Sequence, residues 1–86
     1  MSQQSSIFSF NGDDFVRQHT TLLTEAGASA VGTLLDRDNP GYEALLQKQS
    51  YVGPVTLFGH RYEARYAPLL DAGGQLLGAL MVCVSE

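Results

Sequence analysis

The sequence lacks several features that would each point to a particular class of protein. Its single cysteine, Cys83, excludes an internal disulfide framework and a thiolate-rich zinc site. Only 5 lysines and arginines stand against 9 acidic residues, so the basic stripe that nucleic-acid binding needs is missing and no nucleic-acid partner is expected. No apolar run approaches the roughly 18 residues that span a bilayer, and no signal-peptide pattern is present. We therefore expect this chain to be soluble, without a signal or transmembrane segment.

The residues that are present predict one small globular domain. The chain has 86 residues, 44% of them hydrophobic, and its 4 tyrosines and 4 phenylalanines can anchor a core although tryptophan is absent. Charged residues make up only 16%, and this low share excludes a disordered acidic tail. The first six residues are polar. We expect residues 1–6 to be disordered or frayed and residues 7–86 to form a single domain.

The first half of the chain predicts a hairpin followed by a helix. Apolar residues in 7–10 and β-branched and aromatic residues in 15–23 favour two strands, joined by the turn-forming cluster at 11–14. Asn39 can cap a helix whose first position is Pro40, and apolar residues then follow at helical spacing.

The second half predicts a three-stranded meander. Strands are expected at 52–58, 62–68 and 75–84, separated by turns at 59–60 and 71–74. The sum is an α+β domain: a five-stranded antiparallel sheet with a short helix and loop covering one face. This is the sheet order of a PAS-like fold, and such folds bind small ligands against one sheet face.

Several spaced motifs also carry a family resemblance. They lie at residues 11–17, 32–42, 51–53, 56–59, 62, 66–69 and 71–74. In this order they resemble the single Cache sensory domains of bacterial methyl-accepting chemotaxis receptors and related membrane-bound signalling proteins. The resemblance implies a PAS-like ligand-binding domain that senses a small metabolite for transmembrane signal transduction such as chemotaxis. It further implies a periplasmic or extracytoplasmic location, a membrane-anchored parent protein and a homodimer.

The sequence departs from the family pattern at three points. It lacks the long helix that usually precedes the first strand, and Asn39 stands where many members have a histidine before the proline. Ala64 stands where relatives that bind citrate and dicarboxylates have a basic residue. The resemblance therefore implies a smaller ligand, a small organic monocarboxylate.

Four tyrosines and one asparagine are candidate ligand-binding residues. Tyr62 and Tyr66 share one face of their strand and offer hydroxyl donors above apolar rings. Tyr42 approaches from the helix, Tyr51 from the start of the next strand, and Asn39 lies at the helix cap. The alternative for each tyrosine is a plain packing role.

A carboxylate ligand also needs a cation or an array of donors. Arg37 lies in the loop where relatives place basic groups, so it is the first candidate; the alternative is an exposed arginine paired with Asp36 or Asp38. Arg65 alternates away from the two strand tyrosines, although relatives often keep a basic residue there and a bulge would re-aim it. Arg17 could reach a sheet edge.

No other chemistry is predicted. His19 and His60 lack partners at metal-ligand spacing, and no nucleophile is associated with a base, so we expect no metal, no cofactor and no catalysis. The main alternative is a structural or dimerisation module without a small-molecule ligand, and a weaker one is an acyl- or ester-hydrolysing enzyme. The module is favoured if Leu46, Leu57 and Met81 fill the tyrosine face, or if an apolar strip is exposed.

Overall fold

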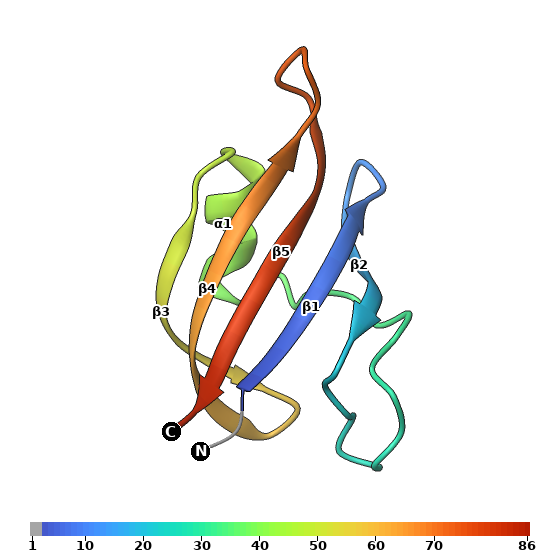
Figure 1. The fold of residues 1–86 in the computed structure, drawn as a ribbon, viewed down its shortest axis with the longest axis vertical. Coiled ribbons are helices and arrows are strands. Elements are labelled where there is room, and N and C mark those ends of the chain that lie inside the picture. The colour runs from blue at the N-terminus through green and yellow to red at the C-terminus, as the bar shows by residue number, and fades with distance from the viewer. Residues whose placement is uncertain (1–2) are drawn as a thin grey trace.

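The computed structural model describes residues 3–86, which form one antiparallel sheet and one short helix (Figure 1). In chain order the elements are β1 (Gln3–Phe10), β2 (Phe15–Thr20), α1 (Pro40–Leu46), β3 (Tyr51–Leu57), β4 (His60–Leu70) and β5 (Leu76–Ser85). The five strands lie in the order β2-β1-β5-β4-β3, so the first and last strands of the chain are neighbours. The predicted α+β fold is confirmed.

The strand β1 begins earlier than the sequence predicts. Residues 3–6 pair in register with β5, and Ser6 is only 2% exposed, with its hydroxyl 2.7 Å from the hydroxyl of Thr20. The expectation of a frayed N-terminus is therefore wrong for residues 3–6, while residues 1–2 lie outside the described residues. The long strand β5 supplies the backbone donors and acceptors that make this polar segment extended.

The segment between β2 and α1 protects an edge of the sheet. β2 ends at Thr20, earlier than the predicted strand end at residue 23. Residues 32–35 then run beside it: the Arg17 N–H donates to the Thr33 carbonyl over 2.9 Å, and the Leu35 N–H donates to the Phe15 carbonyl over 2.9 Å. These bonds use backbone groups that an edge strand would leave unpaired.

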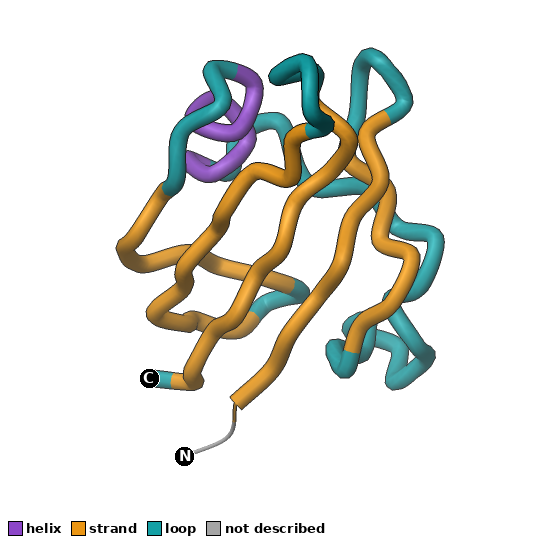
Figure 2. Tube along the Cα trace, turned by 45° about the horizontal axis from the view of Figure 1, so that its top comes forward, coloured by secondary structure: helices purple, strands orange, loops and turns teal. Residues whose placement is uncertain are grey.

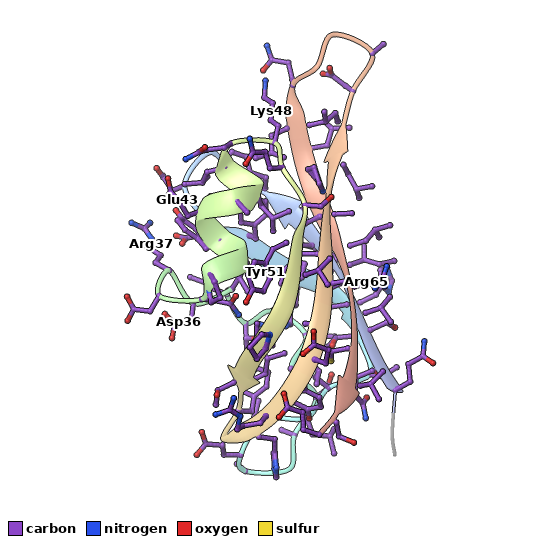
Figure 3. All side chains as sticks on the ribbon, turned by 90° about the vertical axis from the view of Figure 1, so that its left-hand side faces the viewer. Asp36, Arg37, Glu43, Lys48, Tyr51 and Arg65 are labelled. Carbon is purple, nitrogen blue, oxygen red and sulfur yellow. The ribbon has the colours of Figure 1, made fainter. Side chains whose placement is uncertain are left out.

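The helix α1 begins as the sequence predicts. The Asn39 side chain accepts a hydrogen bond from the Gly41 N–H, and Pro40 occupies the first turn, where its missing N–H costs nothing. The chain leaves the helix after Leu46, and Lys48 has a positive φ of 61°. The helix lies on one side of the sheet only (Figure 3), against β3 and β4. We call the side that α1 covers the inner face.

The predicted alternation along β4 is confirmed. Tyr62, Ala64 and Tyr66 are buried on the inner face, whereas Glu63 and Arg65 are exposed on the outer face. The core lies between the inner face, α1 and the segment before it. Its buried apolar residues are Phe8, Phe15, Leu22, Ala30, Leu35, Tyr42, Leu45, Val55, Leu57, Tyr62, Ala64, Tyr66, Ala79, Met81 and Cys83.

The outer face carries no covering element in the part of the chain that the structure describes. The strands form one continuous layer, with α1 near one end (Figure 2). Several apolar side chains on the outer face stay 40% exposed or more: Ile7, Val52, Leu80 and Val82. Within residues 3–86 no helix is long and apolar enough to cross a membrane.

Candidate ligand-binding site

A hydrogen bond joins the helix cap to the centre of the inner face. While Asn39 Oδ1 accepts from the Gly41 N–H over 2.8 Å, its Nδ2 donates to the hydroxyl of Tyr66 over 3.2 Å. Tyr66 is 1% exposed, and burial raises the pKa of its hydroxyl to about 12. A Cβ added to Gly41 would lie 2.9 Å from the Tyr66 ring, so the helix start packs directly on this tyrosine. Asn39 and Tyr66 thus position α1 over the sheet.

The other three candidate tyrosines surround this centre. The Tyr42 hydroxyl donates to the Asp13 carbonyl over 2.6 Å, which ties α1 to the β1–β2 turn. Tyr51 donates to the Pro54 carbonyl over 3.0 Å. Tyr62 is 8% exposed and lines a cleft described below. The hydroxyls of Tyr42 and Tyr51 are therefore engaged by backbone carbonyls, which supports packing roles for both.

The structure does not bring the two predicted arginines to the inner face. Arg37 forms a two-point ion pair with Asp14, each N–O distance being 3.0 Å, and its side chain is 62% exposed. The partner is thus neither Asp36 nor Asp38. The hydrogen bonds from Arg37 lower the pKa of the Asp14 carboxyl. Arg65 projects from the face opposite α1 (Figure 3), as the alternation along β4 predicts.

The inner face instead holds Arg17, which sequence reasoning assigned no strong role. Arg17 as a whole is only 2% exposed. The guanidinium Nη1 donates to Thr33 Oγ1 and to the Leu34 carbonyl, both over 3.2 Å. The guanidinium carbon lies 4.9 Å from the ring centre of Phe8 and 5.1 Å from that of Phe58. Arg17 is therefore a buried cation held by neutral groups.

No carboxylate of residues 3–86 forms an ion pair with Arg17; the two ion pairs there are Arg37–Asp14 and Arg61–Glu86. Arg17 Nε is buried and has no hydrogen-bond partner. Burial lowers the pKa of the Arg17 guanidinium, because the loss of hydration destabilises its charged form more than the neighbouring groups stabilise it. The site consequently has a donor and a positive charge in excess.

One sequence signal could have located Arg17. Alternation from Phe15, an aromatic residue next to a turn, puts residue 17 on the same side of the strand. In the structure Phe8 pairs directly with Arg17, beside a shift of register between Ile7 and Phe8. That shift, together with the covering segment at 32–35, depends on distant parts of the chain.

Two clefts open near the inner face, which is itself well packed. One of about 360 Å³ lies between residues 36–40 and β3. Another of about 310 Å³ lies between residues 21–27 and the start of β4, where His60 and Tyr62 line it. Leu57 and Met81 are buried at 5% and 1% exposure, so they fill part of the tyrosine face. Among the described residues no group of three metal-ligating side chains occurs.

Comparison with known proteins gives one match. A protein-family model, described as the Cache 3/Cache 2 fusion domain, matches residues 1–86, the whole chain. A search of curated proteins and a search of solved structures each find no match.

Proposed function

We propose that this chain, which belongs to the Cache 3/Cache 2 fusion domain family, binds a small organic monocarboxylate. Cache domains are sensory, ligand-binding domains, and the five-stranded sheet with its short helix agrees with this family. The proposal extends to the parent protein: a membrane-anchored receptor that presents this domain on its extracytoplasmic side for signalling such as chemotaxis.

The observation that carries the carboxylate is the buried and unmatched charge of Arg17. Removing a guanidinium from water is unfavourable by several kcal/mol, unless an anion and hydrogen bonds compensate for the loss of hydration. Arg17 has two neutral acceptors and no carboxylate, and its Nε is without a partner. A ligand carboxylate would supply both the missing charge and the missing acceptor.

The remaining groups of the inner face suit a ligand with one charge and a small apolar part. Phe8 provides an apolar ring next to the guanidinium, and Tyr66 and Asn39 provide polar groups farther along the face. A second carboxylate would need a second cation there. Arg37 and Arg65, the other two candidates, point elsewhere.

A thermal-shift screen tests the proposal. Acetate, propionate, pyruvate, lactate, malate and benzoate are added to the purified chain and to two variants, Arg17→Met and Arg37→Met. A ligand at 100 times its dissociation constant adds about 2.7 kcal/mol, which for a domain of this size raises the melting temperature by about 10–20 °C. We expect a monocarboxylate to raise it in the wild type and in Arg37→Met but not in Arg17→Met. An equal shift in all three proteins, or none in the wild type, would overturn the assignment.

A second function, assembly through the outer face, is favoured by a separate observation. Ile7 pairs with Leu80 across β1 and β5, and Val82 lies on the neighbouring outward position, so their exposed side chains form a strip. Contiguous exposed apolar patches mark interaction sites. Light scattering during gel filtration distinguishes a monomer from a dimer. A wild-type dimer that Leu80→Lys converts to a monomer supports assembly, and a monomeric wild type excludes it.

A further inference from the structure

Access to Arg17 is restricted, because the residue is only 2% exposed and its Nε is buried. The cleft of about 310 Å³ beside β4 is lined by His60 and Tyr62, and Arg17 does not line it. Next to the guanidinium stand the rings of Phe8 and Phe58, with ring centres 4.9 and 5.1 Å from its central carbon. A carboxylate can reach the guanidinium only if one of its neighbours moves.

The two rings differ in how firmly the fold holds them. Phe8 lies within β1, is 2% exposed, and pairs with Arg17 on one side and with Ala79 on the other. Phe58 lies outside the strands, in the two-residue turn that joins β3 to β4, and it is only partly buried. Phe58 is therefore the ring that can leave without breaking the sheet.

The backbone of this turn is unusual for a bulky residue. Phe58 has φ of +50° and Gly59 has φ of +82°, as a tight hairpin turn requires at both central positions. Glycine and asparagine adopt this region readily, whereas a phenylalanine is rare there. The turn also lies against the segment that precedes α1: a Cβ on Gly59 would be 3.6 Å from the Glu25 carboxyl carbon. The same segment lines the 310 Å³ cleft, so the turn lies beside that cleft, while the Phe58 ring contacts the buried arginine.

We propose that Phe58 controls access to Arg17, and that the apolar part of a carboxylate ligand takes the place of its ring. The inference rests on the proposed carboxylate function. It adds a specificity rule: a carboxylate that carries a ring or a branched apolar group replaces the contacts that Phe58 gives up, and acetate does not. It also gives binding a structural consequence, because the β3–β4 turn moves away from residues 21–27 as the ligand enters.

Chemical modification tests access without any ligand. Phenylglyoxal reacts with accessible guanidinium groups, and mass spectrometry reports each arginine of the intact chain separately. In the wild type we expect Arg17 to react far more slowly than the exposed Arg65. In Phe58→Gly, which keeps a residue suited to positive φ, Arg17 should react at least 10-fold faster relative to Arg65. Phe10→Ala serves as the matched control, since Phe10 is also partly buried but packs on Phe15.

Circular dichroism verifies that each variant is folded before its rates are compared. Continued protection of Arg17 in folded Phe58→Gly would refute the gate, as would equal rates for Arg17 and Arg65 in the wild type. Acceleration in Phe10→Ala to the same degree would also refute it, because loosening of the core would then explain the exposure.

Calorimetric titration with acetate, propionate and benzoate tests specificity. If the ring blocks the site nine-tenths of the time or more, its removal strengthens benzoate binding at least 10-fold, and we expect this in Phe58→Gly. The added change Arg17→Met should abolish that binding. Equal affinity in the wild type and in Phe58→Gly refutes the gate and leaves the carboxylate site standing. Exposure of Arg17 in Phe58→Gly without binding of any carboxylate refutes the proposed function instead.

Discussion

The bond between Asn39 and Tyr66 allows the contribution of the helix cap to be separated from that of the buried tyrosine. In Asn39→Ala the Gly41 N–H loses its acceptor, which lowers the free energy of unfolding by about 1 kcal/mol. The same change leaves the Tyr66 hydroxyl buried without the Asn39 donor, at a further cost of about 1–3 kcal/mol. We therefore expect a total loss of about 2–4 kcal/mol.

Asn39→Ser separates the two contributions. Serine is a good helix cap, but its side chain is too short to bridge to Tyr66 while it caps Gly41. This variant should therefore lose only the tyrosine contribution, about 1 kcal/mol less than Asn39→Ala. The double variant with Tyr66→Phe completes a mutant cycle, in which the coupling energy between the two side chains should be about 1 kcal/mol.

Urea unfolding followed by circular dichroism measures each free energy, and thermal unfolding provides a second reading. A loss of about 2–4 kcal/mol lowers the melting temperature by roughly 8–30 °C in a domain of this size. If Asn39→Ser is as unstable as Asn39→Ala, the cap contributes nothing and the prediction is wrong. A coupling energy of zero with Tyr66→Phe would show that the two side chains do not stabilise each other.

Two further predictions concern the ionisable groups. Burial raises the pKa of Tyr66 from its usual 10.0 to about 12, so the folded protein keeps a proton that the unfolded chain releases. The free energy of unfolding should therefore fall by about 2–3 kcal/mol as the pH rises from below 10 to 12. Urea unfolding should show a smaller fall in Tyr66→Phe. Identical falls in the two proteins would contradict this. Arg37→Gln removes an exposed pair with Asp14, so the melting temperature should drop slightly at low salt and not at all in 1 M NaCl; a large drop that persists in salt would show that the pair is structurally important.

Local patterns predicted much of the fold. The turn at 71–74 forms because Asp71 Oδ1 accepts from the N–H groups of Gly73 and Gln75, over 2.8 and 2.9 Å. The helix begins at Asn39 and Pro40 for reasons confined to the same few residues. Such features are readable from sequence because their donors and acceptors lie within four residues of one another.

Features that depend on distant pairing could not be predicted in this way. Residues 3–6 form a strand because β5 lies beside them, and their own polar composition argues against it. Arg37 finds its partner in Asp14, 23 positions earlier, rather than in the neighbouring aspartates. The burial of Arg17 needs both the pairing with β1 and the segment at 32–35. Sequence period alone gives the face of a residue and not what covers that face.

If packing is the only role of Arg17, its charge destabilises the fold without need. Its two hydrogen bonds and two ring contacts recover part of the lost hydration, yet Nε remains without a partner and no carboxylate balances the charge. A methionine, whose terminal methyl reaches the position of Arg17 Nε, would fill the near part of this space without a desolvation penalty. We therefore predict that Arg17→Met, without ligand, unfolds at the same urea concentration as the wild type or a higher one.

This stability measurement is independent of the binding screen, so it tests the same residue from the opposite direction. A protein with an anion site is less stable when the site is empty than when it is filled. Removal of the Arg17 charge should therefore raise or maintain the free energy of unfolding without ligand, and it should abolish the stabilisation by carboxylate. The opposite result is a loss of more than about 2 kcal/mol in Arg17→Met, the range seen when a stabilising buried group is removed. That loss would show that the guanidinium holds β2 to residues 33 and 34 for the fold itself, and the case for a carboxylate at Arg17 would lose its physical basis.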